Sequence, residues 1–154
     1  LETGHFSPRS SIPTPANAMD VGNPSNFERV TAIFGHRHES MAAMISGEVV
    51  DDEATKIAMR DVFREKGVFL DPHTAVGYTA ARRYLDTPEG KGRKVIVLAT
   101  AHPAKFDEIV AATTGQTPPI PANLKEALEL PKKAVLIDNS LEALKDFLTR
   151  TFGV

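Results

Sequence analysis

The chain has 154 residues, a length typical of one domain, and its 42% apolar and 25% charged residues are ordinary globular values that argue against a disordered chain. Twenty acidic residues against eighteen lysines and arginines give a net charge of −2, so charge gives no reason to expect nucleic acid or a membrane surface as a partner. The chain has no cysteine, which excludes a disulfide scaffold, a cysteine-ligated metal site and a thiol nucleophile, and no apolar run is long enough to span a bilayer.

Residues 1–24 are rich in turn-forming residues. They contain four prolines and, before Pro24, seven residues of serine, threonine or asparagine. A folded domain seldom starts in this way. A mobile tail would explain the composition. We expect instead that residues 1–24 are a loop or linker from an upstream part of a longer polypeptide, and that residues 25–154 belong to the C-terminal part of a folded domain.

Three helices are predicted next from capping residues, apolar residues at helical spacing and glycine stops. The first lies within residues 25–35, and the second is a short pattern over residues 39–47. The third begins at Asp51 or Asp52 and ends at Gly67. Its expected buried stripe consists of Ala54, Ile57, Ala58 and Val62, widened by Met59 and Phe63.

The fourth predicted helix, over residues 72–85, has the clearest start. Asp71 is placed to cap it, and a proline lies in its first turn. Further helices are predicted over residues 103–115, over about 122–129, and from about residue 140 onward. The last helix is expected to turn four apolar side chains inward: Leu141, Leu144, Phe147 and Leu148.

Two segments are predicted to be β-strands. Residues 95–100 are rich in β-branched side chains and apolar on both faces, which is typical of a strand buried between two helical layers. Residues 134–137 are a shorter candidate. One or two strands are too few for a sheet that is stable alone. The sequence therefore predicts an α/β fold that is helix-rich, with a few strands of a larger sheet whose other strands lie elsewhere in the parent protein.

The common catalytic motifs are missing from the sequence. It contains no Gly-x-Ser-x-Gly nucleophile elbow, no Gly-x-Gly-x-x-Gly pattern and no P-loop. His36-Arg37-His38 places two imidazoles one residue apart, but no third ligand is nearby in the sequence. We expect a solvated loop at this position and no metal site.

Three polar segments are better candidates for a ligand site. Residues 17–26 precede a predicted helix, whose free N–H groups can bind an anion, and residues 71–76 form the first turn of another helix. Residues 98–106 place Thr100 at the end of the predicted buried strand, where open α/β sheets bind their ligands. Each segment also has a purely structural explanation: a loop leading into a helix, a well-capped helix, and a β–α turn in which His102 is the helix cap.

Taken together and in this order, four motifs closely resemble threonine synthase, in particular its bacterial and fungal branch. They are Thr14-Pro-Ala-Asn-Ala-Met-Asp-Val-Gly-Asn-Pro-Ser-Asn-Phe-Glu-Arg29, Val50-Asp-Asp-Glu53, Leu70-Asp-Pro-His-Thr-Ala-Val76 and Thr100-Ala-His-Pro-Ala-Lys-Phe106. The resemblance covers nearly the whole chain, most loosely beyond Gly115, and four motifs in register are highly specific. The departures are small: Pro15-Ala16 replaces the usual apolar–serine pair, and Gly77 stands where alanine is commoner.

The resemblance implies the C-terminal part of a pyridoxal-phosphate enzyme of fold type II, similar to the β subunit of tryptophan synthase. The family converts O-phospho-L-homoserine and water to L-threonine and phosphate. Its Schiff-base lysine and glycine-rich phosphate cradle lie in the N-terminal two thirds, and neither motif occurs here; Lys105 belongs to the fourth motif above. We therefore expect a cytoplasmic lyase of threonine biosynthesis whose partners are its substrate and its own upstream part, and no activity from this chain alone.

By motif match, the resemblance assigns Thr100 to the cofactor, with its hydroxyl facing the pyridine nitrogen. A neutral hydroxyl can hydrogen-bond this nitrogen without forcing it to be protonated, as a carboxylate would. The candidate pocket-wall residues are Asn23, Ser25, Asn26, Asp71, His73, Thr74 and His102. No catalytic residue and no metal ligand is expected in this chain. The alternative interpretation is a non-catalytic α/β ligand-binding or regulatory module derived from such an enzyme.

Overall fold

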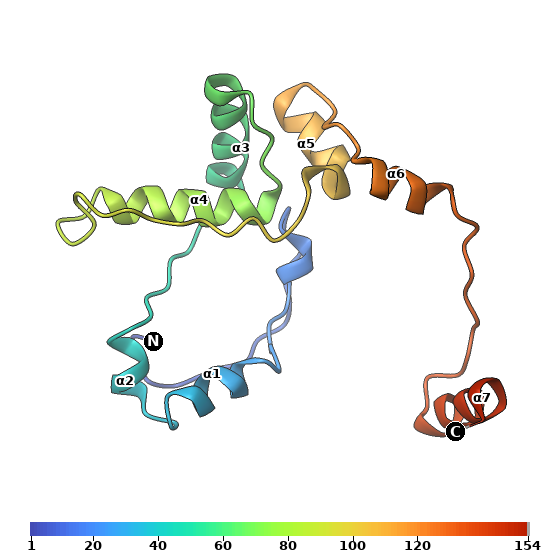
Figure 1. Cartoon of the computed structure of the whole chain (residues 1–154). Helices are drawn as coiled ribbons and strands as arrows, with labels where there is room; N and C mark the ends of the chain where they lie inside the picture. The colour runs from blue at the N-terminus through green and yellow to red at the C-terminus, as the bar shows by residue number, and fades with distance from the viewer. Residues whose placement is uncertain (154) are drawn as a thin grey trace. The chain divides into compact units, whose positions relative to one another are not determined.

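All regular secondary structure within residues 1–153, the part of the chain that this computed structural model describes, is helical (Figure 1). The chain divides into two units, Leu1–Pro119 and Ile120–Val154. None of the described helices has the length and apolar character needed to cross a bilayer. In chain order the elements are η1 (Asn17–Met19, a 3-10 helix), α1 (Phe27–Ile33), α2 (His38–Ala42), α3 (Asp52–Lys66), α4 (Pro72–Leu85), η2 (Pro103–Phe106, a 3-10 helix), α5 (Asp107–Thr114), α6 (Ala122–Glu129) and α7 (Leu141–Phe152).

Each predicted helix is present, but two differ in extent from the prediction. The pattern over residues 39–47 yields only the five helical residues of α2. The helix predicted over residues 103–115 is divided into η2 and α5. The division follows from the local sequence, because His102 caps a proline-led 3-10 turn before Asp107 begins the α-helix.

Side-chain caps and a left-handed glycine set the ends of α3 and α4. The Asp51 carboxylate accepts a hydrogen bond from the Ala54 N–H at 2.8 Å. Gly67 ends α3 with a φ of 66°, a conformation that glycine adopts without steric cost. Asp71 caps α4 as predicted, and Pro72 occupies a first-turn position where no N–H is needed. Local signals were therefore sufficient to predict both helices.

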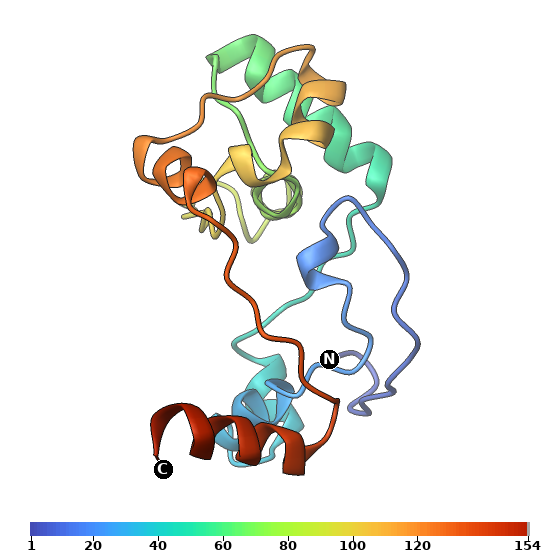
Figure 2. The same ribbon diagram turned by 90° about the vertical axis from the view of Figure 1, so that its right-hand side faces the viewer.

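The core of the first unit lies where α3, α4 and α5 meet. Figure 2 shows α3 and α5 side by side across α4, which is seen end-on. The fully buried side chains of Met59, Ala75 and Val110 come from these three helices in turn. Partly buried side chains pack against them: Phe69, Leu70, Tyr78 and Phe106. Small residues on α3 and α4 let the two helices approach closely.

The buried face of α3 differs from the predicted stripe at Ile57 and Thr55, and the predicted Ala54 and Phe63 are only half-buried. Ala58, Met59 and Val62 are buried as expected, whereas Ile57 is 40% exposed. Thr55 joins the buried face instead, with its hydroxyl donating to the Asp51 carbonyl oxygen. Helix geometry explains the difference, because the buried face passes through residues 55, 58, 59 and 62, which are spaced three and four apart.

The predicted strand over residues 95–100 is not confirmed, because it forms no β-ladder within residues 1–153. Figure 1 shows this segment running back along α4. Val97 packs toward α4, but Ile96 is 87% exposed and Leu98 is 77% exposed, so in this chain the segment is not buried between two layers. A strand is held by hydrogen bonds to a neighbouring strand, and the described residues supply none beside it.

The second unit has apolar residues that its own helices leave uncovered. Residues 134–137 form no strand, and Leu136 is 97% exposed. The prediction that the apolar face of α7 points inward is wrong for this unit, in which Leu141, Leu144 and Leu148 are all exposed. α6 has only eight residues and buries none of its own side chains, so it supplies no core against which α7 could pack.

Candidate functional site

A buried carboxylate organises the first turn of α4. The Asp71 side chain is 1% exposed. Its Oδ1 atom accepts hydrogen bonds from the N–H groups of His73 at 3.0 Å and Thr74 at 3.4 Å. The same oxygen accepts from Nδ1 of His73 at 2.9 Å, and Oδ2 accepts from the Thr74 hydroxyl. A buried carboxylate is costly unless it is hydrogen-bonded, and these four donors offset that cost.

The imidazole of His73 is held at one nitrogen and left free at the other. Its side chain is 9% exposed, and its bond to Asp71 fixes the orientation of the ring. The second nitrogen, Nε2, is buried and has no hydrogen-bond partner in the described part of the chain. The ring lies against the ring of Phe106, with 4.8 Å between centroids and 53° between planes. Asp71 thereby fixes a flat, buried surface that faces the fourth motif.

Thr100 and His102 lie just before η2. His102 caps this turn, since its Nδ1 accepts from the Ala104 N–H at 3.2 Å, which confirms the structural explanation of that residue. Thr100 is exposed, and its hydroxyl makes no hydrogen bond within residues 1–153. Its hydroxyl is therefore available to a group outside the described residues.

The first motif forms a tied loop around η1. The N–H and the hydroxyl of Thr14 both donate to the Asp20 carboxylate, at 2.8 and 2.7 Å. The N–H of Arg9 donates to the Gly22 carbonyl at 3.1 Å. A Cβ at position 22 would lie 1.8 Å from the Arg9 carbonyl oxygen, so only glycine permits this pairing of backbones.

Three of the candidate pocket-wall residues lie beyond this loop, at the start of α1. Asn23, Ser25 and Asn26 are exposed, and Asn26 makes no side-chain cap to the helix. Their side chains make no hydrogen bond in the described structure. The structure thus brings Asp71, His73 and Thr74 together but leaves these three residues apart from them.

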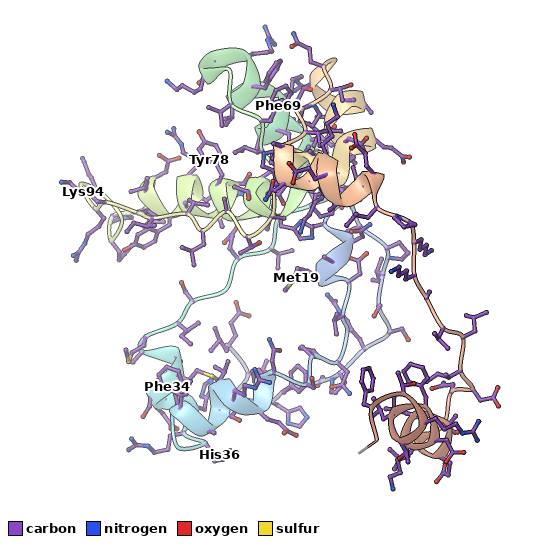
Figure 3. The ribbon with its side chains drawn as sticks, turned by 45° about the vertical axis from the view of Figure 1, so that its right-hand side comes forward. Met19, Phe34, His36, Phe69, Tyr78 and Lys94 are labelled. Atoms are coloured by element: carbon purple, nitrogen blue, oxygen red, sulfur yellow. The ribbon has the colours of Figure 1, made fainter. Side chains whose placement is uncertain are left out.

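Phe106 is where three of the four motifs meet. It contacts His73 of the third motif and belongs to the fourth. A hollow of about 380 Å³ is lined by Lys105 and Phe106 together with Thr14, Pro15 and Asn17 of the first motif. Figure 3 shows Met19 on η1, the short helix of this loop, below α4 in this view. The sequence predicts Phe106 only as a residue inside a helix and gives no signal for this contact, although the residue ends the fourth motif.

His36 and Arg37 lie in the connection between α1 and α2, whereas His38 begins α2, is half-buried and contacts the Leu1 carbonyl oxygen through Nε2. His36 has a φ of 56°, and the side chains of His36 and Arg37 are exposed, as expected of a solvated loop. This segment borders a hollow of about 220 Å³ whose wall includes the stacked rings of Phe6 and Phe27. Within residues 1–153, no three histidine or acidic side chains gather closely enough to hold a metal ion.

Known proteins match nearly the whole length of this chain. A family profile described as threonine synthase, C-terminal, matches residues 74–148. A threonine synthase of Serratia marcescens is 37% identical over 148 residues, which cover 96% of this chain and 33% of that protein. The crystal structure of threonine synthase from Escherichia coli superposes with a TM-score of 0.77 and 34% identity, covering 97% of this chain and 33% of that one. The chain matches the C-terminal part of threonine synthases.

The likeness to threonine synthases confirms the resemblance carried by the four motifs. The crystal structure of the threonine synthase from Brucella melitensis with PLP bound also matches, with a TM-score of 0.76 and 25% identity over 97% of this chain and 36% of that one. The chain spans about a third of the length of the threonine synthases that it matches, and it corresponds to their C-terminal part.

Proposed function

We propose that this chain is the C-terminal part of a threonine synthase that, at full length, converts O-phospho-L-homoserine and water to L-threonine and phosphate in the cytoplasm. The observation that carries the proposal is the match to threonine synthase over 97% of the chain in both backbone and sequence. The four motifs lie within that match. No feature of the described residues favours the alternative of a non-catalytic module.

One residue of this chain, Thr100, has a side chain that fits a contact with the ring nitrogen of pyridoxal phosphate. Thr100 has an exposed hydroxyl without a partner in the described residues, and this hydroxyl can donate to or accept from a ring nitrogen. The fit is partial, because the sequence has no glycine-rich phosphate cradle. When bound, the cofactor supplies an electron sink for the elimination of phosphate. This chain would supply the hydroxyl that meets the pyridine nitrogen.

The remaining candidate residues divide into two groups. Asp71, His73 and Thr74 hold one another and set the first turn of α4, so we assign them to the framework of the pocket. The second group has exposed side chains, and only the motif match assigns its members to the pocket wall: Asn23, Ser25, Asn26 and His102. Their amide, hydroxyl and imidazole groups suit a phosphorylated amino-acid substrate, whose oxygens accept hydrogen bonds.

The exposed apolar residues suit a partner within the same polypeptide. Ile96 and Leu98 on the extended segment, and Leu141 and Leu144 on α7, are exposed in this chain. An upstream part twice as long as this chain, as in the relatives, would cover them and supply neighbouring strands. In this arrangement residues 1–24 connect the two parts, and the chain alone is inactive because the cofactor lysine lies upstream.

The test is to assay the full-length protein that contains this sequence for phosphate and threonine produced from O-phosphohomoserine. Turnover that depends on added pyridoxal phosphate would support the proposal. The chain of 154 residues is assayed beside it and should be inactive. A full-length protein that binds the cofactor but leaves O-phosphohomoserine intact would overturn the assigned reaction.

A further inference from the structure

We propose that His73 is a positioning residue for Thr100, and that it acts through Phe106. This inference rests on the proposed function, which assigns the Thr100 hydroxyl to the pyridine nitrogen of the cofactor. It adds a physical link between the third and fourth motifs. His73 itself touches neither cofactor nor substrate in this proposal.

The first step of the link is the fixed ring of His73. Nδ1 of the ring is bound to the Asp71 carboxylate at 2.9 Å, and Asp71 is itself tied to two N–H groups at the start of α4. The ring therefore cannot rotate without breaking a hydrogen bond to a buried carboxylate, which is costly. Its plane is set by the framework of the helix.

The second step is the contact between the rings of His73 and Phe106. The centroids lie 4.8 Å apart, within the range of a favourable aromatic pair. Phe106 is the last residue of η2, which His102 caps and Pro103 begins. A capped turn that begins with proline has little conformational freedom. Fixing Phe106 therefore fixes the short, stiff turn that directly follows Thr100 and Ala101.

The unpartnered nitrogen of His73 is a second, independent observation. Nε2 is buried and lacks a partner in the described residues, and an unsatisfied buried polar atom costs free energy. An aliphatic side chain would fill the same space without that cost. A role in packing alone does not explain an imidazole here, whereas a ring whose plane is set by Asp71 does.

The same chain contains a suitable control for a loss of core packing. Val110 on α5 is fully buried in the core with Met59 and Ala75, and it belongs to none of the four motifs. Val110→Ala removes apolar contacts from the cluster against which Phe106 also packs, and so destabilises the core, but it leaves the Asp71–His73 hydrogen bond and the His73 ring in place. A purely structural effect of His73 should therefore look like the effect of Val110→Ala at equal loss of thermal stability.

The experiment is a double-mutant cycle on cofactor binding by the full-length protein. The variants are Thr100→Val, His73→Leu and the two combined, with Val110→Ala as the control. Each apoprotein is titrated with pyridoxal phosphate, and the absorbance spectrum of the bound cofactor is recorded before any substrate is added. If His73→Leu does not fold, Phe106→Leu removes the same contact between the two rings from the other side.

We expect His73→Leu and Thr100→Val each to weaken cofactor binding by about 10-fold, the worth of one hydrogen bond, and to shift the spectrum in the same direction. The combined variant should be weaker than Thr100→Val by about twofold at most, because His73 acts through Thr100. Val110→Ala should leave the spectrum unchanged.

Where Thr100→Val does weaken cofactor binding, two results would overturn the positioning role. One is a combined loss equal to the product of the two single losses. The other is a Val110→Ala variant that reproduces the spectral shift of His73→Leu at the same thermal stability. If Thr100→Val leaves both cofactor binding and the spectrum unchanged in an active enzyme, the positioning role fails while the proposed function stands. If the wild-type protein neither binds the cofactor nor makes threonine, the proposed function itself fails.

Discussion

Gly77, in the middle of α4, directly faces the side chain of Val97 on the extended segment. A Cβ at position 77 would lie 3.3 Å from Cγ1 of Val97, which is a close but tolerable contact. This is the point at which residues 95–98 pack on the helix, while Ile96 and Leu98 on either side are exposed. Position 77 therefore controls how closely the segment that leads to Thr100 approaches α4.

Gly77→Ala should stabilise the full-length protein by about 0.5 kcal/mol. Alanine gains up to about 1 kcal/mol over glycine inside a helix, and the close contact with Val97 offsets part of this gain. Gly77→Leu should destabilise it, because a larger side chain displaces Val97. Denaturant unfolding measures both changes. Gly90→Ala is the control: its Cβ would lie 1.9 Å from the Tyr84 carbonyl oxygen, so it should be destabilising. A stability loss with Gly77→Ala would contradict the reading of this contact.

Helices could be predicted from the sequence because their signals lie within a few residues of one another. The Asp71 carboxylate accepts hydrogen bonds from the N–H groups of His73 and Thr74, which lie two and three positions further along the chain. The left-handed Gly67 ends α3 without contacts from distant parts of the chain. The strand at residues 95–100 has the right composition but no neighbouring strand among the described residues, and composition cannot supply one. A strand forms only when a neighbouring strand offers hydrogen bonds, and the sequence of one segment does not contain that information.

The candidate site shows the same division between local and distant contacts. The alternative explanation of His102 as a helix cap depends only on its place before Pro103, and the structure confirms that cap, whereas its place in the pocket wall stays a prediction. The contact of His73 with Phe106 joins residues from two different helices, and only folding brings them together. Likewise the exposure of Leu144 on α7 could not be read from its apolar spacing, because an amphipathic pattern does not say which surface covers it.

Asp71→Ala should be more damaging than Asp51→Ala, although both residues cap a helix. Asp51 is exposed and caps α3 with one side-chain hydrogen bond, at 2.8 Å from the Ala54 nitrogen, so its loss should cost about 1 kcal/mol. Asp71 is buried and accepts from four donors, so its loss should cost about 2–4 kcal/mol. Unfolding of the full-length variants measures the difference. Equal losses would show that burial of the Asp71 cluster adds nothing.

The isolated chain should self-associate through the apolar face of α7. Leu141, Leu144 and Leu148 are exposed on this helix, and exposed apolar faces promote association. Leu144→Glu should reduce the sedimentation-average mass toward that of the monomer. Lys145→Glu is the control, because it introduces the same carboxylate on an exposed residue next to Leu144 that is not part of the apolar face. This variant should have the same sedimentation-average mass as the unmodified chain. A chain that is monomeric without any substitution would refute this prediction.

The isolated chain should form no stable covalent adduct with pyridoxal phosphate. It contains nine lysines, and none lies in the context of the family's cofactor lysine. Incubation with the cofactor, borohydride reduction and peptide mapping would show at most scattered, substoichiometric labelling of exposed lysines. Stoichiometric labelling of one of them, Lys105 included, would mean that the chain carries its own cofactor site and that the lysine need not lie upstream.

Thr100 should tolerate serine but not valine in the full-length enzyme. If its hydroxyl meets the pyridine nitrogen as we propose, Thr100→Ser should keep this contact and much of the activity, whereas Thr100→Val keeps the shape but removes the partner of that nitrogen. One hydrogen bond lost in a desolvated site is worth roughly 1–3 kcal/mol, or about 5- to 150-fold in rate if it acts in the transition state.

Thr100→Asp should reduce turnover further than Thr100→Val. A carboxylate at this position favours a protonated ring and places a charge in the closed pocket, where charges are costly. Turnover of O-phosphohomoserine is measured with cofactor occupancy checked by absorbance, so that weak loading is not mistaken for slow chemistry. Within residues 1–153 the hydroxyl has no other hydrogen-bond partner, so its removal should cost nothing elsewhere in this part of the fold. A fully loaded Thr100→Val enzyme that matches the wild type would show that Thr100 only leads into η2 and that its match to the family does not extend to its role.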